Sequence, residues 1–180
     1  MNLTVTKANI WFLLSCLVIA PVVLGASPTL TWQDVPSSGA PSPRDGFAMV
    51  TTGSKVIIWG GKNATSALGD SYIYDTSSQT WTTITAGGGP LDRWHPGYAW
   101  TGTRLFIWGG GNAVNPMSDG AIYDLAGNTW TTLPTAGAPS FRDGHTNIWD
   151  GNRVNVYAGA SAGAGLQDSA HRYDPSSNTW

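Results

Sequence analysis

Three arginines recur at one interval along the chain, and they are the residues best suited to bind an anionic ligand. They lie 49 residues apart, at Arg44, Arg93 and Arg142. A guanidinium group is planar and can donate two parallel hydrogen bonds to a carboxylate or a phosphate. The alternative is that each arginine pairs with the aspartate beside it, Asp45 or Asp143, and only braces the fold. Because the second arginine is followed by a tryptophan, Arg93 has no aspartate beside it and is expected to be the arginine without a partner, free to bind a ligand.

Aromatic and imidazole side chains accompany these arginines. Trp94 could stack on a sugar ring or on an aromatic side chain of a partner, or it could pack between sheets. His95 and His145 do not share the 49-residue register, and no carboxylates accompany them in a metal-binding pattern, so they are expected to be ordinary rim or core residues. The sequence therefore predicts a binding site without catalytic residues, metal or cofactor. Its candidate residues are Arg44, Arg93, Trp94, His95, Arg142 and His145.

The elements that must position these residues repeat at the same interval. Tryptophans recur every 49, 49 and 50 residues, at Trp32, Trp81, Trp130 and Trp180. Short runs rich in Val, Ile, Thr, Tyr and Trp alternate with clusters of Gly, Asn, Asp and Ser, a pattern typical of antiparallel hairpins. In the first unit, strands are predicted at residues 47–51, 55–59, 71–74 and 80–85. The third unit gains one residue before Tyr173, which could form a bulge or a longer loop.

This repeated block resembles the kelch repeat. The resemblance lies in Gly60-Gly61 after an apolar strand, Tyr74-Asp75 after a loop, and Trp81. It recurs in the second unit and is partial in the third, where Ala158 replaces the first glycine. The family implies an all-β fold, a partial kelch-type β-propeller of three four-stranded antiparallel blades within residues 27–180. The blades are expected at about residues 44–85, 93–134 and 142–180, with an N-terminal outer strand around residues 29–35.

The resemblance also implies where the candidate site lies. In this family the first strand of each blade is nearest the axis, so the candidate residues are expected at the mouth of the central channel. In kelch domains that bind acidic peptides, arginines at this place line the central pocket. Three blades do not close a ring of ordinary geometry. Either C-terminal blades are missing from this chain, or two chains pair into a six-bladed ring.

Residues 1–26 differ from the rest and are predicted to be a signal peptide. Lys7 precedes an apolar run from Ile10 to Leu24, with cleavage expected near Gly25 or Ala26. The alternatives are an uncleaved anchor or, more weakly, a lipoprotein signal around Cys16. The expected location is secreted, periplasmic or at the cell surface. The chain has a net charge of −2 and no basic stripe, which argues against a nucleic-acid partner.

Three functions are compatible with these residues. The first is a secreted module that binds a protein or glycan ligand at the channel mouth. The second is a carbohydrate-active kelch enzyme, similar to the sialic-acid epimerases or to the galactose oxidases. The oxidase mechanism needs a cysteine, and Cys16, the only one, is expected to leave with the signal. The third is a structural surface or adhesion module. No catalytic motif is present, so binding is favoured over catalysis.

Overall fold

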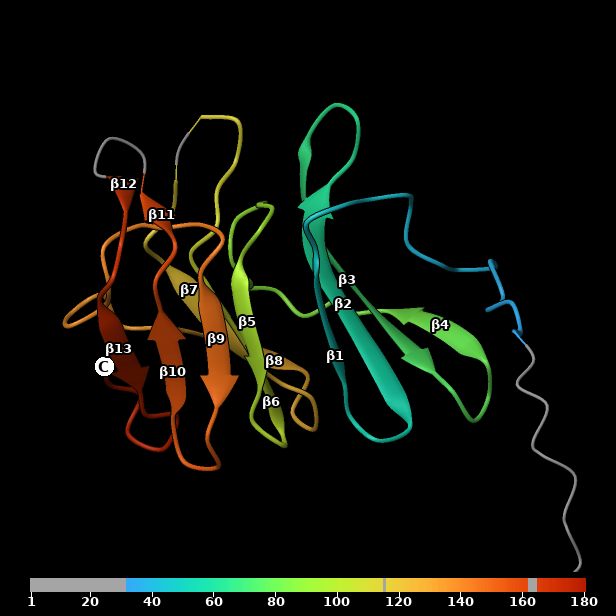
Figure 1. Ribbon diagram of the computed structural model, residues 1–180. Coiled ribbons are helices and arrows are strands. Elements are labelled where there is room, and N and C mark those ends of the chain that lie inside the picture. The colour runs from blue at the N-terminus through green and yellow to red at the C-terminus, as the bar shows by residue number, and fades with distance from the viewer. Residues whose placement is uncertain (1–31, 115, 162–164) are drawn as a thin grey trace, which may run out of the picture. The chain divides into compact units, whose positions relative to one another are not determined.

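The computed structural model describes residues 32–114, 116–161 and 165–180 (Figure 1). The chain divides into two units, residues 1–34 and 35–180. In the first unit the described residues, Trp32–Asp34, are irregular and exposed. None of the described residues forms a helix long and apolar enough to cross a membrane. The predicted signal peptide lies outside the described residues.

The second unit contains two four-stranded antiparallel sheets of the same plan. The first sheet consists of β1 (Ala48–Thr51), β2 (Lys55–Lys62), β3 (Ala67–Asp75) and β4 (Thr80–Thr83). The second consists of β5 (Gly97–Trp100), β6 (Arg104–Trp108), β7 (Gly120–Asp124) and β8 (Thr129–Thr132). In each sheet the strands follow one another in chain order, as expected for successive hairpins.

A third sheet repeats the plan with three strands. Its strands are β9 (Thr146–Trp149), β10 (Val154–Tyr157) and β13 (Ala170–Tyr173). The loop between β10 and β13 carries a small hairpin of β11 (Ala160–Ser161) and β12 (Gly165–Leu166). Asp174 and Thr179 form a single bridge beyond β13, at the place where the first sheet pairs Asp75 with Thr80. The extra residue of the third unit is therefore accommodated in the long β10–β13 loop.

The first strands of consecutive sheets are neighbours, with β5 between β1 and β9 (Figure 1). This is the arrangement that a propeller requires, because the first strand of each blade faces the axis. Paired glycines end the second strand of the first two sheets. Gly60 and Gly61 have φ values of 68° and 95°, which a residue with a Cβ adopts at a cost. The third sheet has Ala158 in this conformation, with φ 61°.

Two apolar clusters join the sheets, and the repeated tryptophans seal both. Trp130 packs on Trp59 of the preceding sheet with ring centroids 6.3 Å apart, and Trp180 packs on Trp108 at 5.7 Å. Trp81, Trp130 and Trp180 also contact the tyrosine of their own unit, as Trp130 does with Tyr123 at 5.1 Å. Burial of such large rings is the main source of stability in a fold built from short strands. Trp130 and Trp180 thus each seal the contact between their own sheet and the preceding one.

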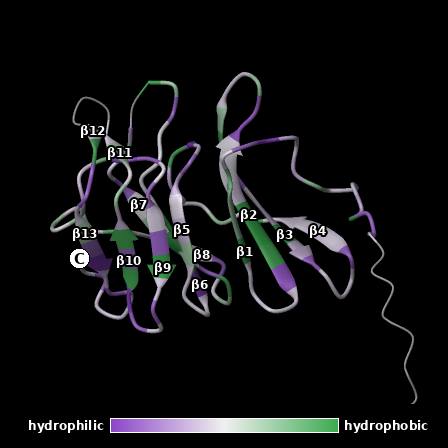
Figure 2. Ribbon diagram, in the orientation of Figure 1, coloured by the Kyte–Doolittle hydropathy of each residue, from purple (hydrophilic) through white to green (hydrophobic). Residues whose placement is uncertain are grey.

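The outer face of the third sheet departs from this pattern. The central cross-strand row is apolar in the first two sheets: Val50, Ile57 and Ile73, then Ala99, Phe106 and Ile122. The same row in the third sheet is Ile148, Asn155 and Arg172. Arg172 Nε donates to Asn155 Oδ1 at 3.1 Å, and Asn155 Nδ2 donates to Asp150 Oδ2 at 2.8 Å. Figure 2 shows the contrast between hydrophobic β10 and hydrophilic β13.

The all-β, partial-propeller architecture predicted from the repeats is confirmed. β2 and β3 run further than predicted, to Lys62 and back to Ala67, because they pair beyond a register shift between Trp59 and Gly61. The outer strand expected around residues 29–35 is not formed by the part of it that the structure describes. Its described part, residues 32–35, belongs to no strand, and the Trp32 side chain is fully exposed.

Candidate functional site

The three repeated arginines occupy equivalent buried positions just before the first strand of each sheet. Arg93 and Arg142 are completely buried, and the side chain of Arg44 is 3% exposed. In each unit the Nε atom donates to the carbonyl oxygen two residues earlier, at 2.8–3.1 Å. Each Nη1 atom also donates to a carbonyl 16 residues later, that of Gly60, Gly109 or Ala158. The arginine thus ties the entry of one strand to the exit of the next.

Two of these arginines are neutralised by an aspartate far along the chain. Arg44 Nη1 and Nη2 donate to both carboxylate oxygens of Asp70, at 2.6 and 2.9 Å. Arg93 Nη2 donates to Asp119 Oδ2 at 3.0 Å. These hydrogen bonds from Arg44 lower the pKa of Asp70, although burial opposes the shift. The two buried charges are therefore already paired within the protein.

Arg142 is buried without a carboxylate. Its Nη2 atom donates to Ser169 Oγ at 3.1 Å and to Ser140 Oγ at 3.2 Å, and the other donors reach backbone carbonyls. Ser169 takes the place of Asp70 and Asp119 because the inserted residue shifts the third unit by one position. Burial lowers the pKa of Arg142, as desolvation disfavours the charged form.

These contacts change the interpretation of the arginines. The expectation that Arg93 lacks a partner is wrong, since its guanidinium contacts Asp119 and is inaccessible. The expectation that neighbouring Asp45 or Asp143 would be the partner is also wrong. All three guanidinium groups are held by internal acceptors, so none is presented to a ligand in this structure. The 49-residue spacing of Asp70 and Asp119 is the sequence signal that identifies the partners of Arg44 and Arg93.

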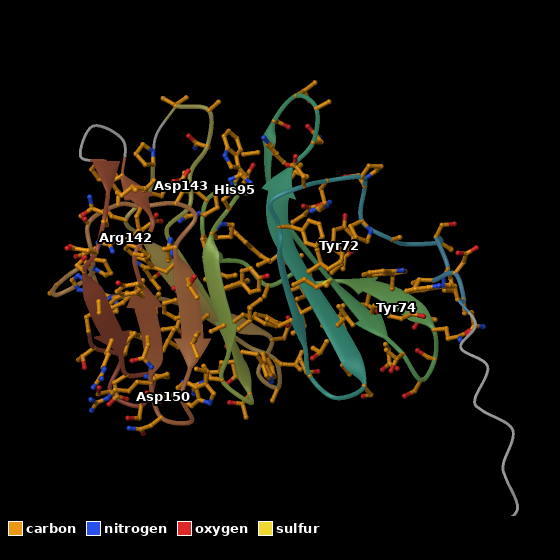
Figure 3. The ribbon with its side chains drawn as sticks, in the orientation of Figure 1. Tyr72, Tyr74, His95, Arg142, Asp143 and Asp150 are labelled. Atoms are coloured by element: carbon orange, nitrogen blue, oxygen red, sulfur yellow. The ribbon has the colours of Figure 1, made fainter. Side chains whose placement is uncertain are left out.

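The residue that follows each arginine is the one that reaches the surface. Asp45, Trp94 and Asp143 each form an isolated β-bridge to a residue near the exit of the second strand, namely Lys62, Gly111 and Ala160. These backbone bridges fix the three variable residues at the same end of their sheets. His95 and Asp143 lie at this end, whereas Asp150 lies at the opposite end (Figure 3).

Three cavities open on this end of the sheets, and the variable residues line them. Asp45 and Trp94 line a cavity of about 540 Å³, and Trp94 and Asp143 line another of about 350 Å³. His95 and Asp143 line a third of about 440 Å³. We call this surface the loop face. It comprises residues 43–45, 62–66, 94–95, 111–114, 116, 143–144, 158–161 and 166–167.

Trp94 lines two of the three cavities of the loop face and is only partly buried. Lys62 Nζ lies 5.2 Å from the centroid of the Trp94 ring and 3.9 Å from Asp45 Oδ1. The loop after Lys62 is shaped by Asn63, whose Oδ1 accepts hydrogen bonds from the backbone amides of Thr65 and Ser66. Lys62 carries no repeat signature, so sequence reasoning did not single it out.

The two candidate histidines lie in different environments. His95 is exposed on the loop face with a positive φ of 49°. His145 is 8% exposed, lies edge-on to Trp108 at 5.2 Å, and has no hydrogen-bond partner on either ring nitrogen. Burial, and then the charge of Arg142, lower the pKa of His145 to about 4, while the Trp108 backbone opposes the shift. His145 is therefore a neutral interior residue, separate from the loop face.

The loop face has the features of a recognition surface. Across the described ranges, no group of three His, Cys, Asp or Glu side chains could hold a metal ion. What the face offers is an aromatic ring between carboxylates, on loops held by a rigid sheet scaffold.

Comparison with known proteins agrees with this architecture. No curated protein matches the chain at a significant level. The family model described as the KLHDC2/KLHL20/DRC7 Kelch-repeats domain matches residues 22–180. Domains of this kind are protein-interaction modules in general. The repeated sheets, the tryptophans packed between them and the paired glycines at the strand exits agree with this match. The chain belongs to the KLHDC2/KLHL20/DRC7 Kelch-repeats domain family.

Proposed function

We propose that this chain is an exported kelch module that binds a protein partner through its loop face, at the predicted mouth of the propeller channel. The main support is that adjacent residues of each repeat have different roles, one in the scaffold and one on the surface. The arginine is constant and buried, whereas the next residue varies between Asp45, Trp94 and Asp143 and lines a cavity. A scaffold that holds variable residues at one end of its sheets is suited to recognition.

The character of the loop face supports a protein ligand. Trp94 supplies a large amphipathic surface, which is characteristic of residues that dominate binding energy in protein interfaces. The adjoining loops contribute small polar groups such as Ser66 and Asn63, which form a polar rim. Export is supported by the charge and apolar run of residues 1–26.

Selection from a displayed peptide library against the full chain tests this proposal. Peptides that bind the wild-type protein should lose at least tenfold in affinity for the Trp94→Ala variant, because truncation of an aromatic hot-spot residue costs about 2 kcal/mol or more. The matched control is Tyr157→Ala, which removes an aromatic side chain that is 56% exposed and lines none of the three loop-face cavities.

Melting temperatures of both variants separate binding from folding, and Asp143→Asn provides a second loop-face variant with almost unchanged volume. If the selected peptides bind Trp94→Ala and Asp143→Asn as tightly as wild type, the loop face is not the binding surface. Peptides that depend on Tyr157 instead would assign binding to the outer face of the third sheet.

A further inference from the structure

The chain places one of its own cations in the centre of the loop face. Lys62 Nζ lies over the Trp94 ring at 5.2 Å and beside the Asp45 carboxylate at 3.9 Å. Asp45 and Lys62 are held opposite each other by two backbone hydrogen bonds, at 3.0 and 2.9 Å, and Trp94 comes from the next sheet. An aromatic face together with a carboxylate is a combination by which proteins recognise an ammonium or guanidinium group.

The charges around this pair favour a cationic ligand. Asp45 is 70% exposed and Asp143 lies beyond Trp94, in the wall of the cavity that both residues line. Besides the imidazole of His95, the basic residues that line the loop face are Arg44 and Lys62, and Arg44 is committed to Asp70. An anionic ligand would therefore be repelled by the carboxylates of Asp45 and Asp143. Its nearest lysine, Lys62, already interacts with Asp45 and Trp94.

Lys62 is well suited to leave this position. Its side chain is 37% exposed, and a lysine has a flexible stem and a strongly hydrated ammonium group. A contact between such exposed charges contributes little free energy, so an incoming side chain can displace it at small cost. The resident lysine then occupies the site as a weak competitor.

We propose that Trp94 and Asp45 form a receptor for a lysine or arginine side chain of the protein partner, and that Lys62 occupies this receptor until the partner displaces it. The inference rests on the proposed function and specifies the chemistry of the partner at that surface. It requires that removal of Lys62 strengthens binding of a cation, whereas removal of a recognition lysine would weaken binding of an anion.

Two short probes test the sign of this effect. The first is a five-residue peptide of glycine and serine with a central arginine and capped ends, and the second is identical except for a central glutamate. Each is titrated into the full chain, and the indole N–H resonance of Trp94 is followed by NMR after assignment with Trp94→Phe. The arginine peptide should shift this resonance saturably. In Lys62→Met it should bind roughly threefold to tenfold more tightly, because a resident cation–π contact and a surface ion pair no longer compete.

The controls use matched positions. Lys55→Met removes the lysine at the other end of β2, which pairs with Asp75 at 3.2 Å away from the loop face, and should leave the titration unchanged. Asp45→Asn should weaken binding of the arginine peptide. Saturable binding of the glutamate peptide that Lys62→Met abolishes would overturn the inference and make Lys62 an anion receptor.

The failure of this inference differs from the failure of the proposed function. If neither peptide shifts Trp94 in wild type or in Lys62→Met, the cation receptor is rejected. Library peptides that still require Trp94 but carry no basic residue would then leave the loop face as a protein-binding surface with another recognition chemistry.

Discussion

A buried positive charge without a carboxylate distinguishes the third unit from the other two. Arg44 and Arg93 each meet an aspartate, whereas Arg142 meets Ser169. Neutral hydroxyl and carbonyl acceptors satisfy its donors, yet they do not offset the cost of moving a charge from water into the interior. The burial of Arg142 is therefore less favourable in free energy than the burial of Arg44 or Arg93.

Placing a carboxylate beside Arg142 should stabilise the protein. Ser169→Asp should raise the free energy of unfolding by about 1 kcal/mol, because the new carboxylate can pair with Arg142 as Asp119 pairs with Arg93. Chemical denaturation followed by tryptophan fluorescence measures the change. The reciprocal variant Asp119→Ser should lose stability, and a gain in both variants would contradict this account.

At the residue scale, the sequence pointed to these arginine positions and left two roles open, binding an anionic ligand or bracing the fold, and the contacts support bracing with partners other than the expected ones. Repeat spacing identified Arg44, Arg93 and Arg142, and the structure shows all three to be held by internal acceptors. The 49-residue spacing of Asp70 and Asp119 hints at two of the partners, but the pairing itself is visible only in the structure, because the partners are 26 or 27 residues away, across a sheet. Lys62 was missed because its contacts with Trp94 and Asp45 are formed only when two sheets meet.

At the scale of elements, the contact between β5 and β9 contains polar groups that the protein leaves unpaired. Asn147 on β9 and His145 just before it have buried side-chain atoms without hydrogen-bond partners. They approach Gly97 on β5 so closely that a Cβ there would clash with both. A buried imidazole in such a place is tolerated only in its neutral form.

This arrangement predicts a pH dependence of stability. In the unfolded chain the imidazole of His145 becomes protonated below about pH 6.5. In the folded chain its pKa is lowered to about 4, so it stays neutral down to that pH. The free energy of unfolding should therefore fall as the pH drops from about 6.5 to 4, by an amount of order 3 kcal/mol. Denaturation midpoints across this range measure the loss, and His145→Gln should flatten it. An unchanged slope in that variant would assign the dependence to other groups.

Individual strands were predictable because their apolar runs end at glycine and aspartate turns. The predicted ends of β2 and β3 were less accurate. Their pairing continues past the register shift at Gly61, through Lys62 and Ala67, and this depends on how the loop folds back rather than on local residue preferences.

At the scale of the whole repeat array, one cross-strand row of the third sheet is more polar than the equivalent rows of the first two sheets. This row of the third sheet contains Asn155 and Arg172, where the first sheet has buried Ile57 and partly buried Ile73 and the second sheet has buried Phe106 and Ile122. This face is therefore poorly suited to the tryptophan-sealed packing that joins the other sheets.

Converting this row to an apolar one should promote self-association. The double variant Asn155→Ile and Arg172→Ile, together with exposed Ile148, would recreate the row that is buried between the other sheets. Sedimentation should show a higher average mass for the variant than for wild type at the same concentration. Equal masses would indicate that the polar row does not limit association.

The repeat pattern predicted the architecture because a fixed interval of tryptophans and glycines determines how successive sheets stack. It did not predict the polar row. Asn155 and Arg172 look unremarkable in the sequence, and their meaning appears only when the register aligns them with Ile57 and Ile73.

The hydrogen bonds between successive sheets affect the cooperativity of unfolding. Gly61 N donates to the carbonyl of Arg93 at 2.9 Å, and Gly110 N donates to the carbonyl of Arg142 at 2.9 Å. The residue that braces each sheet internally is thus also the anchor of the sheet before it. Detaching one sheet therefore disrupts its neighbour, which couples the repeats energetically. The described repeats should consequently unfold in one cooperative step, without populating a species that has lost a single sheet.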